Sequence, residues 1–136
     1  MEMKKICVEA KDENLYPVLD FIKDFLGEQR CSAKIQMMIE VCMEELFVNV
    51  SHYAYPNRSG QVEVQVKVDE ENVEIVLTDN GIPFNPLVKE DPDITLSTEE
   101  RKIGGLGIYL VKKKMDEVFY RYEGEKNILT IRKRIK

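Results

Sequence analysis

Two adjacent segments alternate strictly between apolar and polar residues, and this pattern limits the fold more than any other feature of the chain. In residues 61–68 valine takes every second position, and Val73, Ile75 and Leu77 repeat the pattern up to Asp79. A period of two is that of a β-strand with one buried face. Residues 69–72, Asp-Glu-Glu-Asn, suit a turn. The sequence therefore predicts a hairpin of two half-buried strands.

Other segments repeat their apolar residues at helical spacing. Ser32 suits the N-cap of one helix, and Gly27 suits the C-cap of the helix before it. The expected order is β-α-α-β-β-loop-α-β-β, which predicts an α/β (α+β) two-layer sandwich: a mostly antiparallel, mixed sheet with helices on one face. Helices are expected at about 14–27, 33–53 and 106–115, and further strands at 3–10, 118–122 and 128–134.

Composition narrows the class of protein. The chain has 136 residues, of which 43% are hydrophobic, so residues 1–136 are expected to form a single domain. The net charge of -5 gives no reason to expect nucleic acid or an anionic membrane as partner. The first residues are charged, and no apolar run approaches the ~20 residues of a membrane span. Three scattered cysteines favour neither zinc nor disulfides, so a cytoplasmic location is expected.

Glu45 and Asn49 lie four residues apart, on one side of the second expected helix. One interpretation is structural, a hydrogen-bonded network at the edge of the core. The other is chemical, because an amide oxygen suits Mg²⁺ and a carboxylate can act as a general base. Spacing alone leaves both open. Glu44 is expected to be exposed.

Asp79-Asn80-Gly81 follows the second strand of the hairpin. Asp, Asn and Gly are common turn residues, so a simple turn is one interpretation. The other is recognition of a base, in which a buried carboxylate accepts a hydrogen bond from an exocyclic amine and a glycine allows close approach.

Gly104-Gly105-Leu106-Gly107 leads directly into the third expected helix. Backbone amides and a helix N-terminus then coincide, which suits phosphate. The run lacks the pattern of a P-loop and the position of a dinucleotide fingerprint. A long proline-containing segment, 83–103, precedes it, and such a loop in a small domain is typically functional or mobile.

In this order, the three motifs resemble the nucleotide site of the GHKL (Bergerat-fold) ATPase superfamily. Residues 45–56, which end in Ala-Tyr-Pro, resemble the N-box of its anti-sigma-factor serine-protein kinases. Asp79-Asn80-Gly81 with the following Pro-Phe-Asn-Pro resembles their G1 box, and residues 104–107 resemble their G2 box. Tyr53 stands where those kinases frequently have histidine, so His52 is expected to be a surface residue.

The resemblance implies a Bergerat ATP-binding fold with ATP and Mg²⁺ as cofactors. It implies that Asn49 binds Mg²⁺, that Glu45 is the catalytic base, and that residues at about 84–103 form the ATP lid. Lys102, beside Arg101, would neutralise phosphate or lie exposed in the lid. The remaining cofactor-binding residues that it implies are Asp79, Gly81, Gly104, Gly105, Leu106, Gly107, Ile108 and Thr130, the last supporting adenine through water.

The resemblance further implies an ATP-dependent serine-protein kinase that acts as an anti-sigma factor. Such kinases form homodimers, sequester a sigma factor and phosphorylate a STAS-type anti-anti-sigma protein. An alternative is an ATP-binding module that sequesters a partner without phosphotransfer. A purely structural α/β domain is a third hypothesis, and it predicts no response to ATP.

Overall fold

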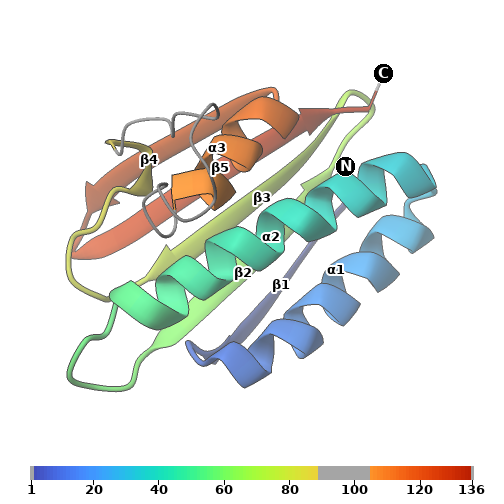
Figure 1. Cartoon of the computed structure of the whole chain (residues 1–136). Coiled ribbons are helices and arrows are strands. Elements are labelled where there is room, and N and C mark those ends of the chain that lie inside the picture. The colour runs from blue at the N-terminus through green and yellow to red at the C-terminus, as the bar shows by residue number, and fades with distance from the viewer. Residues whose placement is uncertain (1, 89–104, 136) are drawn as a thin grey trace.

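The computed structural model describes residues 2–88 and 105–135 (Figure 1). Within them, three α-helices cover one face of a five-stranded sheet, which confirms the two-layer sandwich. Short 3-10 turns at Asp12–Asn14 and Pro86–Val88 complete the described elements. The helices and strands are β1 (Glu2–Glu9), α1 (Leu15–Glu28), α2 (Ala33–Tyr53), β2 (Gln61–Val68), β3 (Asn72–Asp79), α3 (Gly105–Lys114), β4 (Glu117–Glu123) and β5 (Lys126–Arg134).

The strands lie in the order β1-β2-β3-β5-β4. All four neighbouring pairs are antiparallel, so the sheet is antiparallel throughout and not mixed. β5 pairs with β3 although α3 and β4 separate the two strands in the chain. This pairing places Asp79, the last residue of β3, opposite Asn127 near the start of β5.

The apolar positions of the hairpin form the floor of the core. Val62, Val64 and Val66 of β2 are fully buried, as is Ile75 of β3. The helices bury large side chains against this floor, and burying one such side chain contributes about 1.5–3 kcal/mol. The largest of these helical side chains are Phe25, Leu26, Ile39, Met43, Leu46, Phe47 and Ile108.

The ends of α1 and α2 test two predictions. Ser32 caps α2 as predicted, because its Oγ accepts a hydrogen bond of 3.2 Å from Ile35 N. The prediction for Gly27 is wrong. The helix continues through it to Glu28, and the left-handed residue is Arg30, with φ 61°. Hydrogen bonds from Arg30 N to Gly27 O and from Cys31 N to Leu26 O close the helix.

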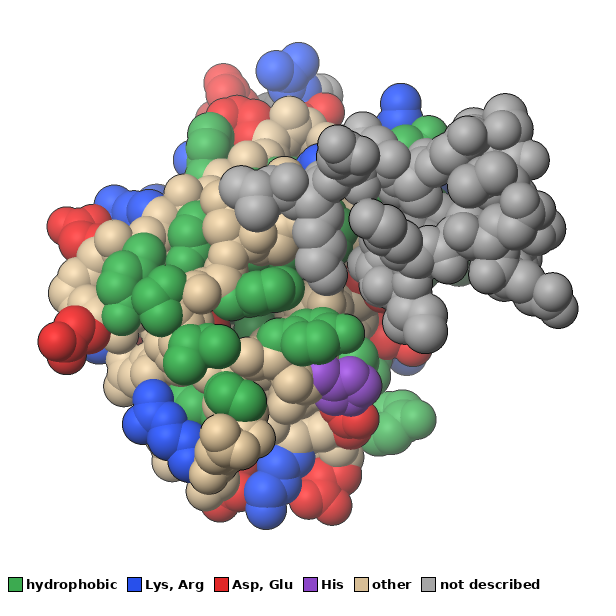
Figure 2. All heavy atoms as spheres, turned by 60° about the vertical axis from the view of Figure 1, so that its left-hand side comes forward, with side chains coloured by type: hydrophobic (Ala, Val, Ile, Leu, Met, Phe, Trp, Pro, Cys, Tyr) green, Lys and Arg blue, Asp and Glu red, His purple; other side chains and the backbone are tan. Residues whose placement is uncertain are grey.

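The surface carries no extended region of one charge on the face shown in Figure 2, where acidic and basic side chains lie among hydrophobic ones. In the part of the chain that the structure describes, no helix has both the length and the apolarity needed to cross a membrane.

Candidate functional site

The carboxylate of Asp79 lies at the end of β3 with only 6% of the residue exposed. Its Oδ1 accepts hydrogen bonds from Gly81 N, at 2.8 Å, and from Asn127 Nδ2, at 2.9 Å. Burial raises the pKa of Asp79 above its usual 3.8, and these two hydrogen bonds oppose that effect. The turn that the sequence allowed is therefore present, and it also holds a buried ionisable group.

A small hollow of about 30 Å³ adjoins this carboxylate. It has room for one or two water molecules, so a purine base would need some lining side chains to move. Ala54, Phe84 and Pro86 are the lining residues that lie outside the α-helices and strands. The lining residues are Leu46, Asn49, Val50, Ala54, Leu77, Asp79, Phe84, Pro86, Tyr120, Asn127 and Leu129.

Helix α2 contains both Glu45 and Asn49, the predicted general base and the predicted Mg²⁺ ligand. Asn49 lines the hollow, and Glu45, one turn earlier, is half-buried. A Cβ built on Gly107 would lie 2.0 Å from Oε2 of Glu45, so the missing side chain at this position leaves room for the carboxylate. Glu44 is exposed, as predicted.

Helix α3 begins at Gly105, so the glycine-rich turn leads into a helix as predicted. Gly107 and Ile108, near its start, are buried. The contact between Gly107 and Glu45 places a carboxylate of α2 beside the N-terminal turn of α3, where the helix dipole favours negative charge. Gly104 and Lys102 lie outside the described residues, as do Arg101 and the lid from residue 89 onward.

The segment after α2 supports the turn after β3. Tyr55 accepts a hydrogen bond of 2.9 Å from Asn80 N through its hydroxyl, which also donates to Gln61 O at 2.7 Å. Ile82 N donates to Ala54 O at 2.9 Å. The Ala-Tyr-Pro sequence that follows the helix therefore fixes the position of the Asp79 turn.

Replacing Gly81 with alanine is expected to destabilise the protein by about 2 kcal/mol or more. A Cβ there would lie 2.3 Å from the carbonyl oxygen of Ala54, and these backbone atoms cannot rotate away. Gly27→Ala is the matched control. Its Cβ would meet no heavy atom within 4 Å, so in a helix it should stabilise by about 0.5–1 kcal/mol. Urea unfolding measures both, and a Gly81→Ala variant as stable as the parent chain would contradict the packing described.

Thr130 does not lie beside Asp79, and its predicted role in supporting adenine stays a prediction. Side chains alternate along β5, and Asn127, Leu129 and Ile131 are buried against the helices. Thr130 has the opposite parity and therefore points to the other face of the sheet, away from Asp79. Asn127 is the residue of β5 whose side chain contacts Asp79. Its parity with Leu129 and Ile131 could have placed it on the buried face of the sheet, but not opposite Asp79.

His52 is exposed, as predicted, and its Nε2 lies 2.8 Å from Asp12 Oδ2. Ser51 Oγ donates to the other oxygen of Asp12 at 2.5 Å. Hydrogen bonds from Ser51 and His52 lower the pKa of Asp12. Tyr53 stacks on Phe84, with ring centroids 5.5 Å apart. The histidine thus anchors the turn after β1, whereas the tyrosine contacts the lining of the hollow.

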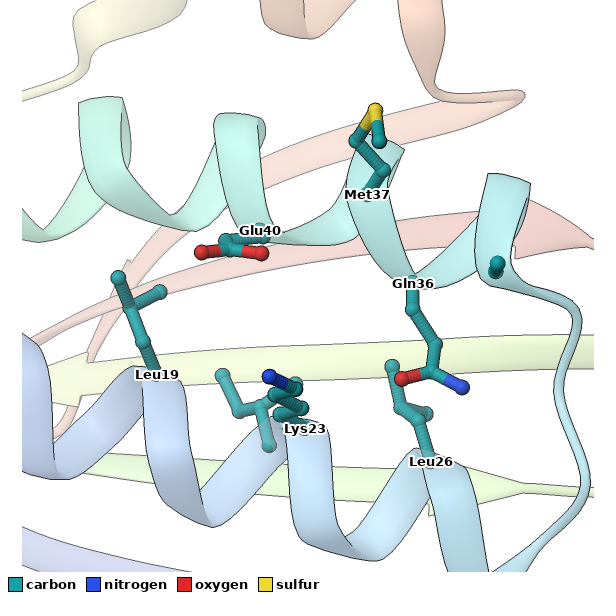
Figure 3. Close-up of a pocket in the computed structure, with 8 residues that line it drawn as sticks. Leu19, Lys23, Leu26, Gln36, Met37 and Glu40 are labelled. Carbon is teal, nitrogen blue, oxygen red and sulfur yellow. The ribbon is translucent and has the colours of Figure 1, made fainter.

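A larger hollow of about 210 Å³ lies elsewhere, between α1 and α2 (Figure 3). It shares no lining residue with the hollow at Asp79. Its wall is mainly aliphatic and offers neither the Asp79 turn nor the start of α3, so its size does not make it a nucleotide site. The residues that line it are Leu19, Ile22, Lys23 and Leu26 from α1, and Ala33, Gln36, Met37 and Glu40 from α2.

The metal prediction rests on Asn49. Within residues 2–88 and 105–135, no group of three or more His, Cys, Asp or Glu side chains could hold a metal ion. That finding excludes a zinc-type cluster from this part of the chain. The amide oxygen of Asn49 fits Mg²⁺, which takes few protein ligands when phosphate and water supply the others.

Comparison with known proteins identifies the family. The family described as histidine kinase-like ATPase domain matches residues 8–133. The serine-protein kinase RsbW of Bacillus mycoides is 30% identical over 84 residues, which are 59% of this chain and 52% of that protein. The serine/threonine-protein kinase BtrW of Bordetella bronchiseptica is 25% identical over 103 residues, 75% of this chain and 72% of that protein. The match thus spans about half the length of the RsbW relative.

Solved structures agree on the fold. The RsbU and RsbW domains of Rv1364c from Mycobacterium tuberculosis superpose with a TM-score of 0.71 at 14% identity, covering 99% of this chain and 33% of that one. The catalytic domain of histidine kinase ThkA gives a TM-score of 0.54 at 12% identity, covering 99% of both chains. The sandwich, the order of the motifs and these matches lead to one conclusion: the chain belongs to the histidine kinase-like (GHKL) ATPase domain family.

Proposed function

We propose that this chain is an ATP-dependent protein serine kinase and anti-sigma factor. Its family is an ATPase domain, and the relatives above are named a serine-protein kinase and a serine/threonine-protein kinase. The observation that carries the proposal is the placement of Glu45. Its carboxylate lies against Gly107 in the first turn of α3, one helical turn from Asn49 at the hollow that contains Asp79. The proposed general base and the proposed metal ligand thus lie one turn apart on α2, and the metal ligand lines the same hollow as the carboxylate proposed to recognise adenine.

Each residue has a distinct role in the proposed reaction. Asp79 accepts a hydrogen bond from the exocyclic amine of adenine, and Gly81 lets the adenine ring approach the backbone. Asn49 holds Mg²⁺, which neutralises phosphate charge when bound. Backbone amides at the start of α3 stabilise the phosphoryl group, with Gly104, Gly105, Leu106, Gly107 and Ile108 as the proposed phosphate-binding residues and Lys102 as a further cation.

In the transfer step, Glu45 takes the proton of a substrate serine. The bond between the serine oxygen and the γ-phosphorus forms, while the bond from that phosphorus to the β,γ-bridging oxygen breaks and ADP leaves. Catalysis comes mainly from positioning and charge neutralisation. The proposed substrate is a STAS-type anti-anti-sigma protein, and the proposed sequestered partner is a sigma factor bound by a homodimer of this chain.

Mg²⁺–ATP is expected to stabilise the protein by about 2.7 kcal/mol at about 100 times its Kd. A melting experiment measures this shift, and ADP with and without Mg²⁺ is the comparison that reports the metal. The absence of any shift would contradict the nucleotide site and favour a structural domain.

Incubation with labelled ATP and a STAS-type protein from the same genome then separates the two functional hypotheses. Label on a serine of the partner supports the kinase. Partner binding without transfer supports the sequestering module. An Asn49→Asp variant reports the metal ligand, because its altered charge should change the Mg²⁺ dependence of nucleotide binding.

A further inference from the structure

Asn127 uses all of its hydrogen-bonding groups in the wall of the hollow. Its Oδ1 accepts from Phe84 N at 3.0 Å and from the Tyr120 hydroxyl, while its Nδ2 donates to Asp79 Oδ1 at 2.9 Å and to Ile82 O at 2.8 Å. Only 5% of the residue is exposed. Two donors approach the oxygen and two acceptors approach the nitrogen, so the amide can satisfy its partners in one orientation only.

These hydrogen bonds make the two oxygens of the Asp79 carboxylate unequal. Oδ1 receives both Asn127 Nδ2 and Gly81 N. Within the described residues, no hydrogen bond engages Oδ2. A carboxylate whose first oxygen is held by two donors cannot rotate without breaking both bonds. The second oxygen is thereby kept as an acceptor in a defined direction.

Tyr120 fixes the amide from the neighbouring strand. It lies on β4, opposite Leu129 of β5, and lines the same hollow as Asp79. Its hydroxyl donates to Asn127 Oδ1, which leaves Nδ2 as the group that faces Asp79. The chain of contacts therefore runs from Tyr120 through Asn127 to Asp79, and it crosses three strands of the sheet.

We propose that Asn127, held by Tyr120, is a positioning residue that aims the Asp79 carboxylate at the exocyclic amine of a purine nucleotide and so sets the preference for an amino-bearing base. This inference rests on the proposed function, because it assumes that the base enters at Asp79. It adds a residue that touches the recognition carboxylate and not the nucleotide itself. The chemical class that it selects is a 6-aminopurine nucleotide.

The test compares two nucleotides that differ only in that amine, ATP and purine riboside triphosphate. Calorimetric titration gives the Kd of each, with Mg²⁺, for the full chain and for Asn127→Leu. The full chain should prefer ATP by about tenfold or more, since an unpaired buried acceptor disfavours the analogue. In Asn127→Leu the affinity for ATP should fall by about tenfold, whereas that for the analogue should change by less than about threefold.

Two further variants keep the test decisive. Tyr120→Phe removes a single hydroxyl and should also reduce the preference for ATP over the analogue. This variant tests the inference if Asn127→Leu does not fold. Ile128→Val changes a residue on the same strand but on its opposite face, so it should leave both affinities unchanged. Circular dichroism and melting establish folding for each variant.

Four outcomes count against the inference. Equal loss of affinity for both nucleotides in Asn127→Leu shows a merely structural role. An unchanged ratio of the two Kd values in Tyr120→Phe shows that the Tyr120 hydroxyl is not needed to hold the Asn127 amide. A full chain that binds neither nucleotide overturns the proposed function itself, whereas a full chain that binds both equally overturns only the discrimination inferred here.

Discussion

Replacing Glu45 with glutamine is expected to slow phosphate transfer by about 10²- to 10⁴-fold. Glutamine keeps the size of the side chain and its hydrogen bonding, but it cannot take the proton of the substrate serine. Affinity for ATP should change by less than about threefold, because the proposed role of Glu45 lies in the transfer step. Single-turnover transfer of labelled phosphate to the partner protein measures the rate, and nucleotide titration measures the affinity.

The matched control is Glu44→Gln. Glu44 precedes Glu45 on α2 and carries the same charge, but it is exposed, while the Glu45 carboxylate abuts Gly107. Its replacement should leave both rate and affinity unchanged. Transfer at the parental rate in Glu45→Gln would show that another group is the base. Equal loss in both variants would point to net charge and not to a positioned proton acceptor.

Local patterns were enough to predict most of the fold. The alternation in residues 61–68 gives the bounds of β2 without error, since a half-buried strand has a period of two regardless of its neighbours. The prediction for Gly27 is wrong because a glycine near a helix end fits a C-cap when only the sequence is considered. The end is decided by hydrogen bonds that place Arg30, and not a glycine, in the left-handed conformation.

Some residues of the candidate site can be predicted from local patterns, whereas others depend on how distant segments pair. Glu45 and Asn49 share a face of one helix, and Asp79 ends one strand, so each could be found from a local pattern. Asn127 faces Asp79 only because β5 pairs with β3 in one register, after an intervening helix and strand. A one-residue shift of that register would present Ile128 instead. Nothing within the segment around Asn127 contains that information. The roles of all the candidate site residues remain predictions, and Lys102 and Gly104 also lie outside the described residues.

Replacing Asp79 with asparagine is expected to abolish useful ATP binding and to stabilise the nucleotide-free protein. The amide oxygen can keep both bonds that Oδ1 now accepts, from Gly81 and Asn127. Its NH₂ group then faces the base, where an acceptor is required. The NH₂ group of the substituted side chain and the exocyclic amine of adenine are both hydrogen-bond donors. Facing each other in a buried site, they should weaken ATP binding by about 2–4 kcal/mol, or roughly 30- to 1000-fold. Calorimetric titration measures this loss.

The stability gain follows from the direction of the pKa shift. Burial raises the pKa of Asp79 above 3.8, so the folded state holds this proton at pH values where the unfolded state has lost it. Ionising Asp79 therefore lowers stability as pH rises from 3.8 to the raised value, and the whole penalty is present at neutral pH. Asparagine has no proton to lose. The variant should be more stable than the parent at about pH 8, and the difference should shrink as pH falls through this window.

Asp69→Asn provides a control with the opposite sign. The Asp69 carboxylate accepts hydrogen bonds from Asn72 N and Glu71 N, which lower its pKa. Its ionised form therefore stabilises the fold above pH 3.8, and Asp69→Asn should be less stable than the parent at neutral pH while binding ATP normally. Denaturant unfolding at several pH values measures both differences. If Asp79→Asn were less stable than the parent at neutral pH, as expected for Asp69→Asn, then ionised Asp79 would stabilise the fold. That result would contradict the view that the Asp79 charge destabilises the nucleotide-free protein and serves ligand binding.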